Sequence, residues 1–252
     1  MTTQGDDPTA DQEALNDPLV ARLTRLRAEI DDAATQSGRA PEEVSLLLAT
    51  KTQPADRIRV AIAAGYSLIG ENRVQEVVKK AEALTHVPHE LHFIGHLQAN
   101  KVNQLLPHIS CLQTLDSVEL AGKLNSRLDI LDRQLDVLLQ VNVSGEESKS
   151  GVQPAEAVDL LGALAEFPRL RVRGYMTIGL NSPDRSAVRA GFRNLAELRE
   201  SAVTARVPGA AGAVELSMGM SGDFVDAIAE GATIVRLGSA VFGERPSKQA
   251  TG

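Results

Sequence analysis

Residues 44–54 read VSLLLATKTQP, an apolar run that stops at a single lysine and is closed by a proline. An apolar run of this length between breakers predicts a strand over 44–50 that is buried on both faces, as in a parallel sheet. Alternation along that strand places Lys51 on the same side as Leu47 and Ala49. A lysine at the carboxyl end of such a strand lies where α/β folds place their chemistry, although a solvated strand-end lysine is the plainer alternative.

The same strand-then-helix unit recurs along the rest of the chain. A first helix begins at Asp17-Pro18 and ends near Ser37-Gly38. Further strands are predicted at 67–70, 90–94, 110–115, 136–143, 171–178, 213–217 and 233–237, and helices at 55–64, 73–84, 98–105, 117–128, 154–166, 185–204 and 222–230. Eight strands alternating with helices in 252 residues predict an α/β fold, a (β/α)8 TIM barrel. No Gly-x-Gly-x-x-Gly follows the first strand, which disfavours a dinucleotide-binding sheet.

Composition and charge limit the class of protein. Hydrophobic residues make up 43% of the chain, and the net charge of −7 argues against nucleic acid as the main partner. No run approaches the roughly 20 apolar residues of a membrane span. Cys111 alone cannot form an internal disulfide, which fits a cytoplasmic protein, and we expect it to be a small core residue.

The domain boundaries follow from the same reading. We expect a disordered acidic tail over 1–17, one TIM-barrel domain over 18–246 and a flexible C-terminus over 247–252. The tail carries no apolar secretory segment.

The loops after the seventh and eighth predicted strands are rich in glycine and serine. They span 217–223 and 236–243. TIM barrels most often bind phosphate at these two loops, where backbone N–H groups and close glycine contacts favour an anion. The hydroxyls of Ser217, Ser221 and Ser239 would add donors. Tight turns made by the same glycines are the alternative.

Arg236 has the parity of Ile234 and Gly238, so it is expected to point into the barrel. A buried arginine needs an anion, a polar ring atom or a carboxylate as partner. By the same alternation, Gln140 and Asn142 should face the barrel mouth. A strand-end lysine, a phosphate cradle across the barrel and an inward arginine together fit a phosphate cofactor that carries an aldehyde, held as a Schiff base.

Other catalytic sites find less support in the sequence. The five histidines gather in residues 86–108, but without a His-Glu-x-x-His motif or a cysteine pair, so we expect no metal site. His96 follows a strand and could approach a ligand. No Gly-x-Ser-x-Gly motif supports a serine nucleophile. The polar loop 144–151 is most simply a solvated surface.

Several motifs occur in a fixed order from about residue 19 to residue 245. They are Thr50-Lys51-Thr52, GENRVQE (70–76), HFIGHLQANK (92–101), 140–151, RGYMTI (173–178), 216–223 and 235–243. In this combination the chain resembles the YggS/PROSC family of pyridoxal phosphate homeostasis proteins. The resemblance implies a barrel similar to the N-terminal domain of alanine racemase, known as PLP fold type III.

The resemblance also implies a cofactor, pyridoxal 5′-phosphate (PLP), and the residues that hold it. Lys51 matches the lysine that forms the Schiff base, and Arg236 matches the arginine that faces the pyridine nitrogen. The remaining matches are the phosphate-loop positions Ser217, Gly238 and Ser239, with Ser221 a weaker match, and Asn72 near the cofactor. Thr50, Leu91 and Ser239 depart from the family's usual serine, aromatic residue and threonine at those positions.

The sequence leaves three functions open. We expect a PLP-binding homeostasis protein with little or no amino-acid turnover and no catalytic residues, which holds PLP on Lys51 and passes it to apo-enzymes. A PLP-dependent racemase or decarboxylase is the first alternative, although only nine residues follow Gly243, too few for the domain that brings racemases a second acid/base tyrosine. A cofactor-free Schiff-base aldolase is the second. A monomer or weak dimer is expected, with no membrane or nucleic-acid partner.

Overall fold

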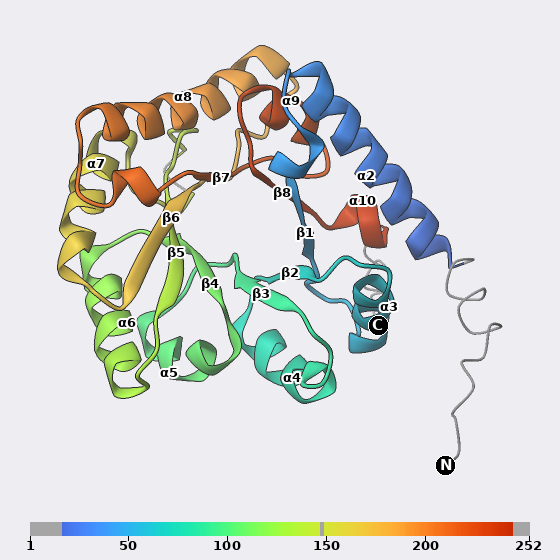
Figure 1. Cartoon of the computed structure of the whole chain (residues 1–252), viewed down its shortest axis with the longest axis horizontal. Coiled ribbons are helices and arrows are strands. Elements are labelled where there is room, and N and C mark those ends of the chain that lie inside the picture. Colours follow the sequence, from blue (N-terminus) through green and yellow to red (C-terminus); the bar gives the residue numbers. More distant parts are fainter. Residues whose placement is uncertain (1–16, 147–148, 244–252) are drawn as a thin grey trace, which may run out of the picture.

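The computed structural model describes residues 17–146 and 149–243, and its strands close into one parallel barrel in the order β1 to β8 (Figure 1). The strands are β1 (Ser45–Ala49), β2 (Leu68–Glu71), β3 (Glu90–Phe93), β4 (Cys111–Leu115), β5 (Leu135–Gln140), β6 (Leu170–Met176), β7 (Glu215–Ser217) and β8 (Ile234–Leu237). The (β/α)8 fold predicted from the sequence is therefore confirmed.

Helices surround the barrel on its outer side (Figure 1). They are α2 (Pro18–Gln36), α3 (Ala55–Ala63), α4 (Val74–Leu84), α5 (Val102–Leu105), α6 (Val118–Ile130), α7 (Pro154–Ala163), α8 (Arg185–Thr204), α9 (Phe224–Ala229) and α10 (Ser239–Phe242). Short 3-10 turns add η1 (Pro41–Glu43), η2 (Ala99–Lys101), η3 (Leu106–His108), η4 (Leu164–Glu166) and η5 (Ala210–Gly212). None of the helices in the described ranges is long and apolar enough to cross a membrane.

The first helix, α2, covers the seam where the barrel closes. Asp17 caps it by accepting a hydrogen bond from the Leu19 N–H at 2.7 Å, as the Asp-Pro start predicted. Because α10 after β8 is only four residues long, α2 packs against α9, α10 and α3 and covers the β8–β1 side. Arg22 Nη1 donates to the Val241 carbonyl at 2.7 Å and ties the two chain ends of the barrel together.

The two faces of the strands pack differently. Outward side chains, among them Leu46 and Leu48 of β1, form one large core with the helices, as the alternation predicted. Inward side chains form smaller apolar clusters, one around Leu47 and another that contains the buried Cys111. The prediction that Cys111 is a core residue is confirmed.

Several boundaries predicted from the sequence differ in the structure or cannot be compared with it. The strand predicted at 171–178 ends at Met176. The strand predicted at 136–143 ends at Gln140, because the chain folds back and its amide side chains bind the following loop. Gln140 Nε2 donates to the Ser150 carbonyl at 3.0 Å, and Asn142 Nδ2 donates to the Glu146 carbonyl at 2.9 Å. The tail 1–17, apart from Asp17, and the C-terminus 247–252 lie outside the described residues.

We expect Gly95→Ala to destabilise the protein by at least ~2 kcal/mol, because a Cβ at Gly95 would overlap the backbone of Asn72. Neither backbone can move without disturbing the ends of β2 and β3. The control is Gly122→Ala in α6, where the new Cβ meets only Phe167 Cε1 at 3.7 Å. That variant should match or exceed wild-type stability by about 0.5–1 kcal/mol in urea unfolding. Equal stabilities for the two variants would contradict this packing.

Candidate functional site

A pocket of about 350 Å³ opens at the carboxyl ends of β7, β8 and β1. This volume is at the lower end of the roughly 300–1,000 Å³ typical of small-molecule sites. The pocket is lined by Ala49, Lys51, Thr52, Gln53, Met220, Ser221, Gly222, Arg236, Gly238, Ser239, Phe242 and Gly243. Because β8 pairs directly with β1, the glycine-rich loops lie beside Lys51. We expected the phosphate-binding loops to lie across the barrel from Lys51. This expectation was wrong, because the loop after β8 follows the strand that pairs directly with β1.

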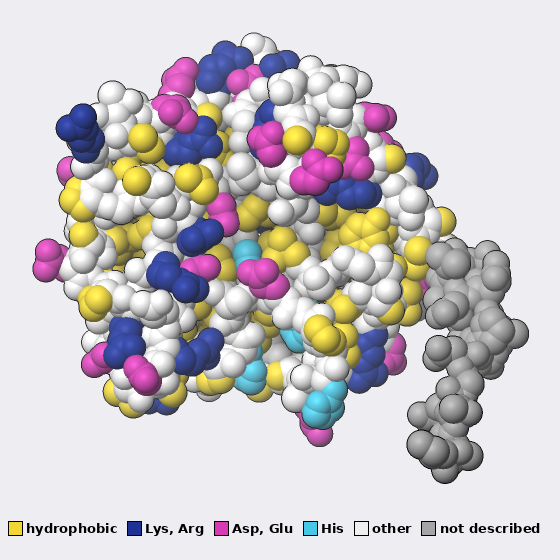
Figure 2. Space-filling model, in the orientation of Figure 1, with side chains coloured by type: hydrophobic (Ala, Val, Ile, Leu, Met, Phe, Trp, Pro, Cys, Tyr) yellow, Lys and Arg dark blue, Asp and Glu magenta, His cyan; other side chains and the backbone are white. Residues whose placement is uncertain are grey.

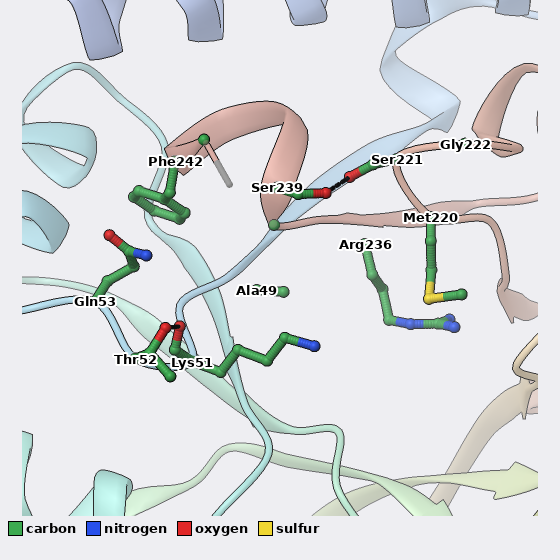
Figure 3. Close-up of a pocket in the computed structure, with 12 residues that line it drawn as sticks. Ala49, Lys51, Thr52, Gln53, Met220, Ser221, Gly222, Arg236, Ser239 and Phe242 are labelled. Carbon is green, nitrogen blue, oxygen red and sulfur yellow. Dashed lines mark hydrogen bonds between the residues drawn. The ribbon is translucent and has the colours of Figure 1, made fainter. Parts of the chain in front are cut away.

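Lys51 follows the end of β1 by two residues and is half-buried. Figure 3 shows its side chain extending into the pocket toward the side where Arg236 lies. The strand-end lysine is thus a pocket residue, which favours the functional interpretation over a merely solvated lysine.

The backbone on both sides of Lys51 is anchored by α4. Lys80 Nζ donates to the Thr50 carbonyl at 2.9 Å, and the Thr52 N–H donates to Glu76 Oε2 at 2.7 Å. Thr52 has a φ of 65°, a left-handed conformation that a β-branched residue adopts only under constraint. The two contacts supply that constraint and hold the direction in which Lys51 leaves the strand.

Lys80 is itself held by two carboxylates. Its Nζ lies 2.6 Å from Glu71 Oε1 and 3.1 Å from Glu76 Oε2, and Glu71 is buried. Burial raises the pKa of Glu71, while Lys80 and the Thr50 hydroxyl oppose that rise. For Glu76, burial also disfavours the charge, but the Thr52 N–H and Lys80 outweigh it and the pKa is lowered.

Arg236 points into the barrel, as its parity predicted. It is 5% exposed, and it donates from Nη1 to Ser217 Oγ at 2.8 Å and from Nη2 to the Thr177 carbonyl at 2.7 Å. Burial lowers its pKa to about 10, with the charge of Asp223 opposing the shift, so the guanidinium remains a cation at neutral pH. No carboxylate among the described residues forms a salt bridge with it, which leaves its charge available to the pocket.

The loops after β7 and β8 supply small and hydroxyl-bearing residues. Ser239 Oγ donates to Ser221 Oγ at 3.2 Å (Figure 3). The Ala240 N–H also donates to Ser221 Oγ, at 3.2 Å. A Cβ at Gly238 would lie 3.2 Å from the Ala49 carbonyl, so glycine keeps this wall of the pocket open. Hydroxyls and backbone N–H groups gathered in this way suit an anion such as a phosphate.

The structure brings together five of the seven cofactor residues proposed from the sequence: Lys51, Ser221, Arg236, Gly238 and Ser239. The other two lie apart from this pocket. Ser217 is fully buried beneath Arg236, and its hydroxyl donates to Gln113 Oε1 at 2.6 Å. Asn72 lines a separate pocket of about 160 Å³ together with His96. The described residues contain no group of three or more His, Cys, Asp or Glu placed to hold a metal ion.

Sequence reasoning missed several contributors. Met220 and Phe242 form apolar walls of the pocket. The Arg57 guanidinium lies over the Phe242 ring, with its Cζ 5.6 Å from the ring centre. Lys80 has a weak signal in the sequence, since it follows Glu76 by four residues on one helical face. Gln113 is two residues after Cys111 in the predicted strand, so both side chains should point into the barrel.

Comparison with known proteins gives consistent matches over most of the chain. The sequence profile of the family described as "Alanine racemase, N-terminal domain" matches residues 22–246. The "Pyridoxal phosphate homeostasis protein" of Aquifex aeolicus is 42% identical over 227 residues, which cover 89% of this chain and 97% of that protein. PipY of Synechococcus elongatus, solved "with PLP bound", has a TM-score of 0.78 at 32% identity, covering 89% of this chain and all of PipY. An alanine racemase of Clostridium difficile shares the fold, with a TM-score of 0.70 at 15% identity over 92% of this chain and 57% of the racemase.

We expect Lys80→Met to destabilise the protein by about 3–5 kcal/mol at pH 8, because it leaves the buried Glu71 carboxylate unpaired. The cost should shrink toward pH 5. Without Lys80 the folded-state pKa of Glu71 rises further above its unfolded value, so stability is lost as pH rises through that folded pKa.

The control for Lys80→Met is Lys123→Met, which removes an exposed partner of Glu119 and should cost less than ~1 kcal/mol at either pH. Urea unfolding at pH 5 and pH 8 measures both variants. A cost for Lys80→Met that does not change between these pH values would contradict the buried ion pair.

Proposed function

Since the chain belongs to the family of pyridoxal phosphate homeostasis proteins, built on the alanine racemase N-terminal domain, we propose that it binds PLP in the pocket beside Lys51. The observation that carries the proposal is the meeting of three different groups in one pocket. These are an amine on Lys51, a hydroxyl-rich pair of loops at Ser221 and Ser239, and the buried cation of Arg236.

These groups complement the three functional groups of PLP. The loop hydroxyls, the nearby N–H groups and the open backbone at Gly238 suit the phosphate. The Lys51 amine suits the aldehyde. The Arg236 guanidinium can donate a hydrogen bond to the pyridine nitrogen, which is an acceptor. When bound, the cofactor supplies an aldehyde that condenses with primary amines. The residues of this chain orient it: Arg236 keeps a donor at the ring nitrogen, and Ser217, beneath it, holds Arg236 in place.

The proposed role is homeostasis: the protein holds PLP on Lys51 and passes it to apo-enzymes, with little or no amino-acid turnover. A cation at the ring nitrogen keeps that nitrogen unprotonated, which makes the ring a weaker electron sink than a carboxylate partner would. The Aquifex relative, which this chain matches along 97% of its length, also carries the name of a homeostasis protein. A monomeric or weakly dimeric state and a cytoplasmic location remain parts of this proposal.

A PLP-dependent racemase or decarboxylase is the competing function, supported by the shared fold of alanine racemase. It requires the PLP-loaded protein to racemise or decarboxylate amino acids, with that activity lost in Lys51→Ala. The cofactor-free aldolase is a weaker alternative, which requires a protein that neither contains nor binds PLP.

The spectrum of the purified protein tests the cofactor and its anchor together. We expect a visible absorption band and, after borohydride reduction, a phosphopyridoxyl adduct that peptide mass mapping places on Lys51. Lys51→Ala should lose the adduct, whereas Lys79→Ala on the exposed side of α4 should retain it. A colourless protein that fails to bind added PLP would overturn the proposal.

Ser239→Ala tests the phosphate loops separately. Loss of one hydrogen bond to a charged phosphate should weaken PLP binding by about 1–2 kcal/mol, or roughly 5- to 30-fold in Kd. Fluorescence titration of the apo-protein measures this effect. Ser126→Ala on the exposed face of α6 is the matched control and should bind as the wild type does. An unchanged Kd for Ser239→Ala would mean that this loop does not hold the phosphate.

A further inference from the structure

A continuous line of hydrogen bonds crosses the barrel from the pocket to the opposite end. Arg236 Nη1 donates to Ser217 Oγ at 2.8 Å, Ser217 Oγ donates to Gln113 Oε1 at 2.6 Å, Gln113 Nε2 lies 2.7 Å from His92 Nδ1, and His92 Nε2 lies 2.9 Å from Glu90 Oε1. Ser217 and Gln113 are fully buried and His92 is 5% exposed, while Glu90 at the start of β3 reaches solvent.

This polar line runs between two apolar clusters of the barrel interior. The neighbouring inward side chains are Leu47, Ile94, Ile234, Cys111, Leu138 and Met176. Buried polar side chains are costly unless every partner is in place, and leucine or isoleucine would fill the same space without that requirement. Packing alone therefore does not explain the line. Because it ends at Arg236, its role is to be sought in the position of that side chain.

The direction of each bond is determined by the two ends. Arg236 has only donors, so Ser217 must accept from it and can give its single proton only to the carbonyl oxygen of Gln113. The Gln113 NH₂ group then faces His92, whose Nδ1 must accept. The Nε2–H of His92 donates to the carboxylate of Glu90. This arrangement requires a neutral His92 with its proton on Nε2.

A proton added to His92 Nδ1 reverses the two middle bonds of the line, between His92 and Gln113 and between Gln113 and Ser217. Two donors would then face each other, so the Gln113 amide must turn over and present its NH₂ group to Ser217. Ser217 would accept from both Gln113 and Arg236, and its hydroxyl proton would lose its acceptor. The contact that supports Arg236 from below is therefore different in the two protonation states of His92.

We propose that Gln113 and His92 are positioning residues that hold Arg236 toward the cofactor, and that protonation of His92 at the far end of the barrel alters this support. The proposal rests on the proposed function, because the ring nitrogen of PLP is the partner of Arg236. It assigns His92 and Gln113 a role in setting the environment of the cofactor without touching it.

The charged side chains around His92 lie near the amino ends of the barrel strands. Glu90 on its own strand and Glu215 on β7 act on it directly; Asp136 on β5, Arg173 on β6 and the Cys111 thiol on β4 complete the surroundings. Figure 2 shows acidic and basic side chains and a histidine near the centre of one face of the barrel. Histidine ordinarily changes its protonation state between about pH 5 and pH 8, so a change of pH over this range tests the line.

Histidine NMR of the apo-protein tests the line without any cofactor. With ¹⁵N-labelled histidine at pH 8, we expect His92 as the neutral tautomer with its proton on Nε2, identified by the loss of its signal in His92→Gln. A proton on Nδ1 at pH 8 overturns the proposal. This experiment is independent of PLP, so a failure of the protein to bind PLP would overturn the proposed function and leave this result standing.

The absorption band of the PLP-loaded protein tests the effect on Arg236. We expect a spectral step between pH 8 and pH 5 in the wild type that is lost in His92→Gln, since glutamine can accept from Gln113 and donate to Glu90 but does not titrate. His108→Gln, the same change at a histidine outside the line, should retain the step. Gln113→Leu should alter the band at every pH; if it does not fold, His92→Gln still decides. A step that persists in His92→Gln, or no step in the wild type, overturns the proposal.

Discussion

The pairing of β8 with β1 is the constraint on which the site depends. Four residue pairs, from Ser45↔Ile234 to Leu48↔Leu237, close the barrel and set Leu47 opposite Arg236. This register places the end of β1 beside the loop that follows β8, so the amine of Lys51 and the N–H groups near Ser239 enter one pocket. The helix α2 covers this seam, which connects the stability of the first helix with the geometry of the site.

The second constraint is the buried charge of Arg236. Desolvation works against the guanidinium, and within the described residues it has one hydroxyl and one carbonyl as hydrogen-bond acceptors but no ion-paired carboxylate. A barrel optimised for stability alone would place an aliphatic side chain there. The arginine and the polar line below it are understandable if its remaining donors serve a ligand in the pocket. Lys51 is oriented from the other side, by Lys80 and Glu76 of α4.

The secondary structure could be predicted well because it depends on the spacing of apolar residues that are close together in the sequence. The apolar run at 44–50 and the spacing of Leu19, Leu23, Leu26 and Ile30 show the periods of a buried strand and an amphipathic helix. The prediction for 136–143 was too long, because Gln140 and Asn142 alternate with apolar residues as strand residues do. Their amides instead bind carbonyls of the loop up to ten positions away, which alternation does not reveal.

The sequence by itself determined the kind of fold, the inward side of Arg236 and the chemical types of the pocket residues, because side-chain alternation and loop composition are properties of neighbouring residues. Only the tertiary structure decided that the glycine-rich loops lie beside Lys51, that Ser217 supports Arg236 from beneath, and that Gln113 and His92 extend this support to Glu90. Those relations join residues up to 104 positions apart, and they depend on strand register and barrel closure, which no local pattern encodes.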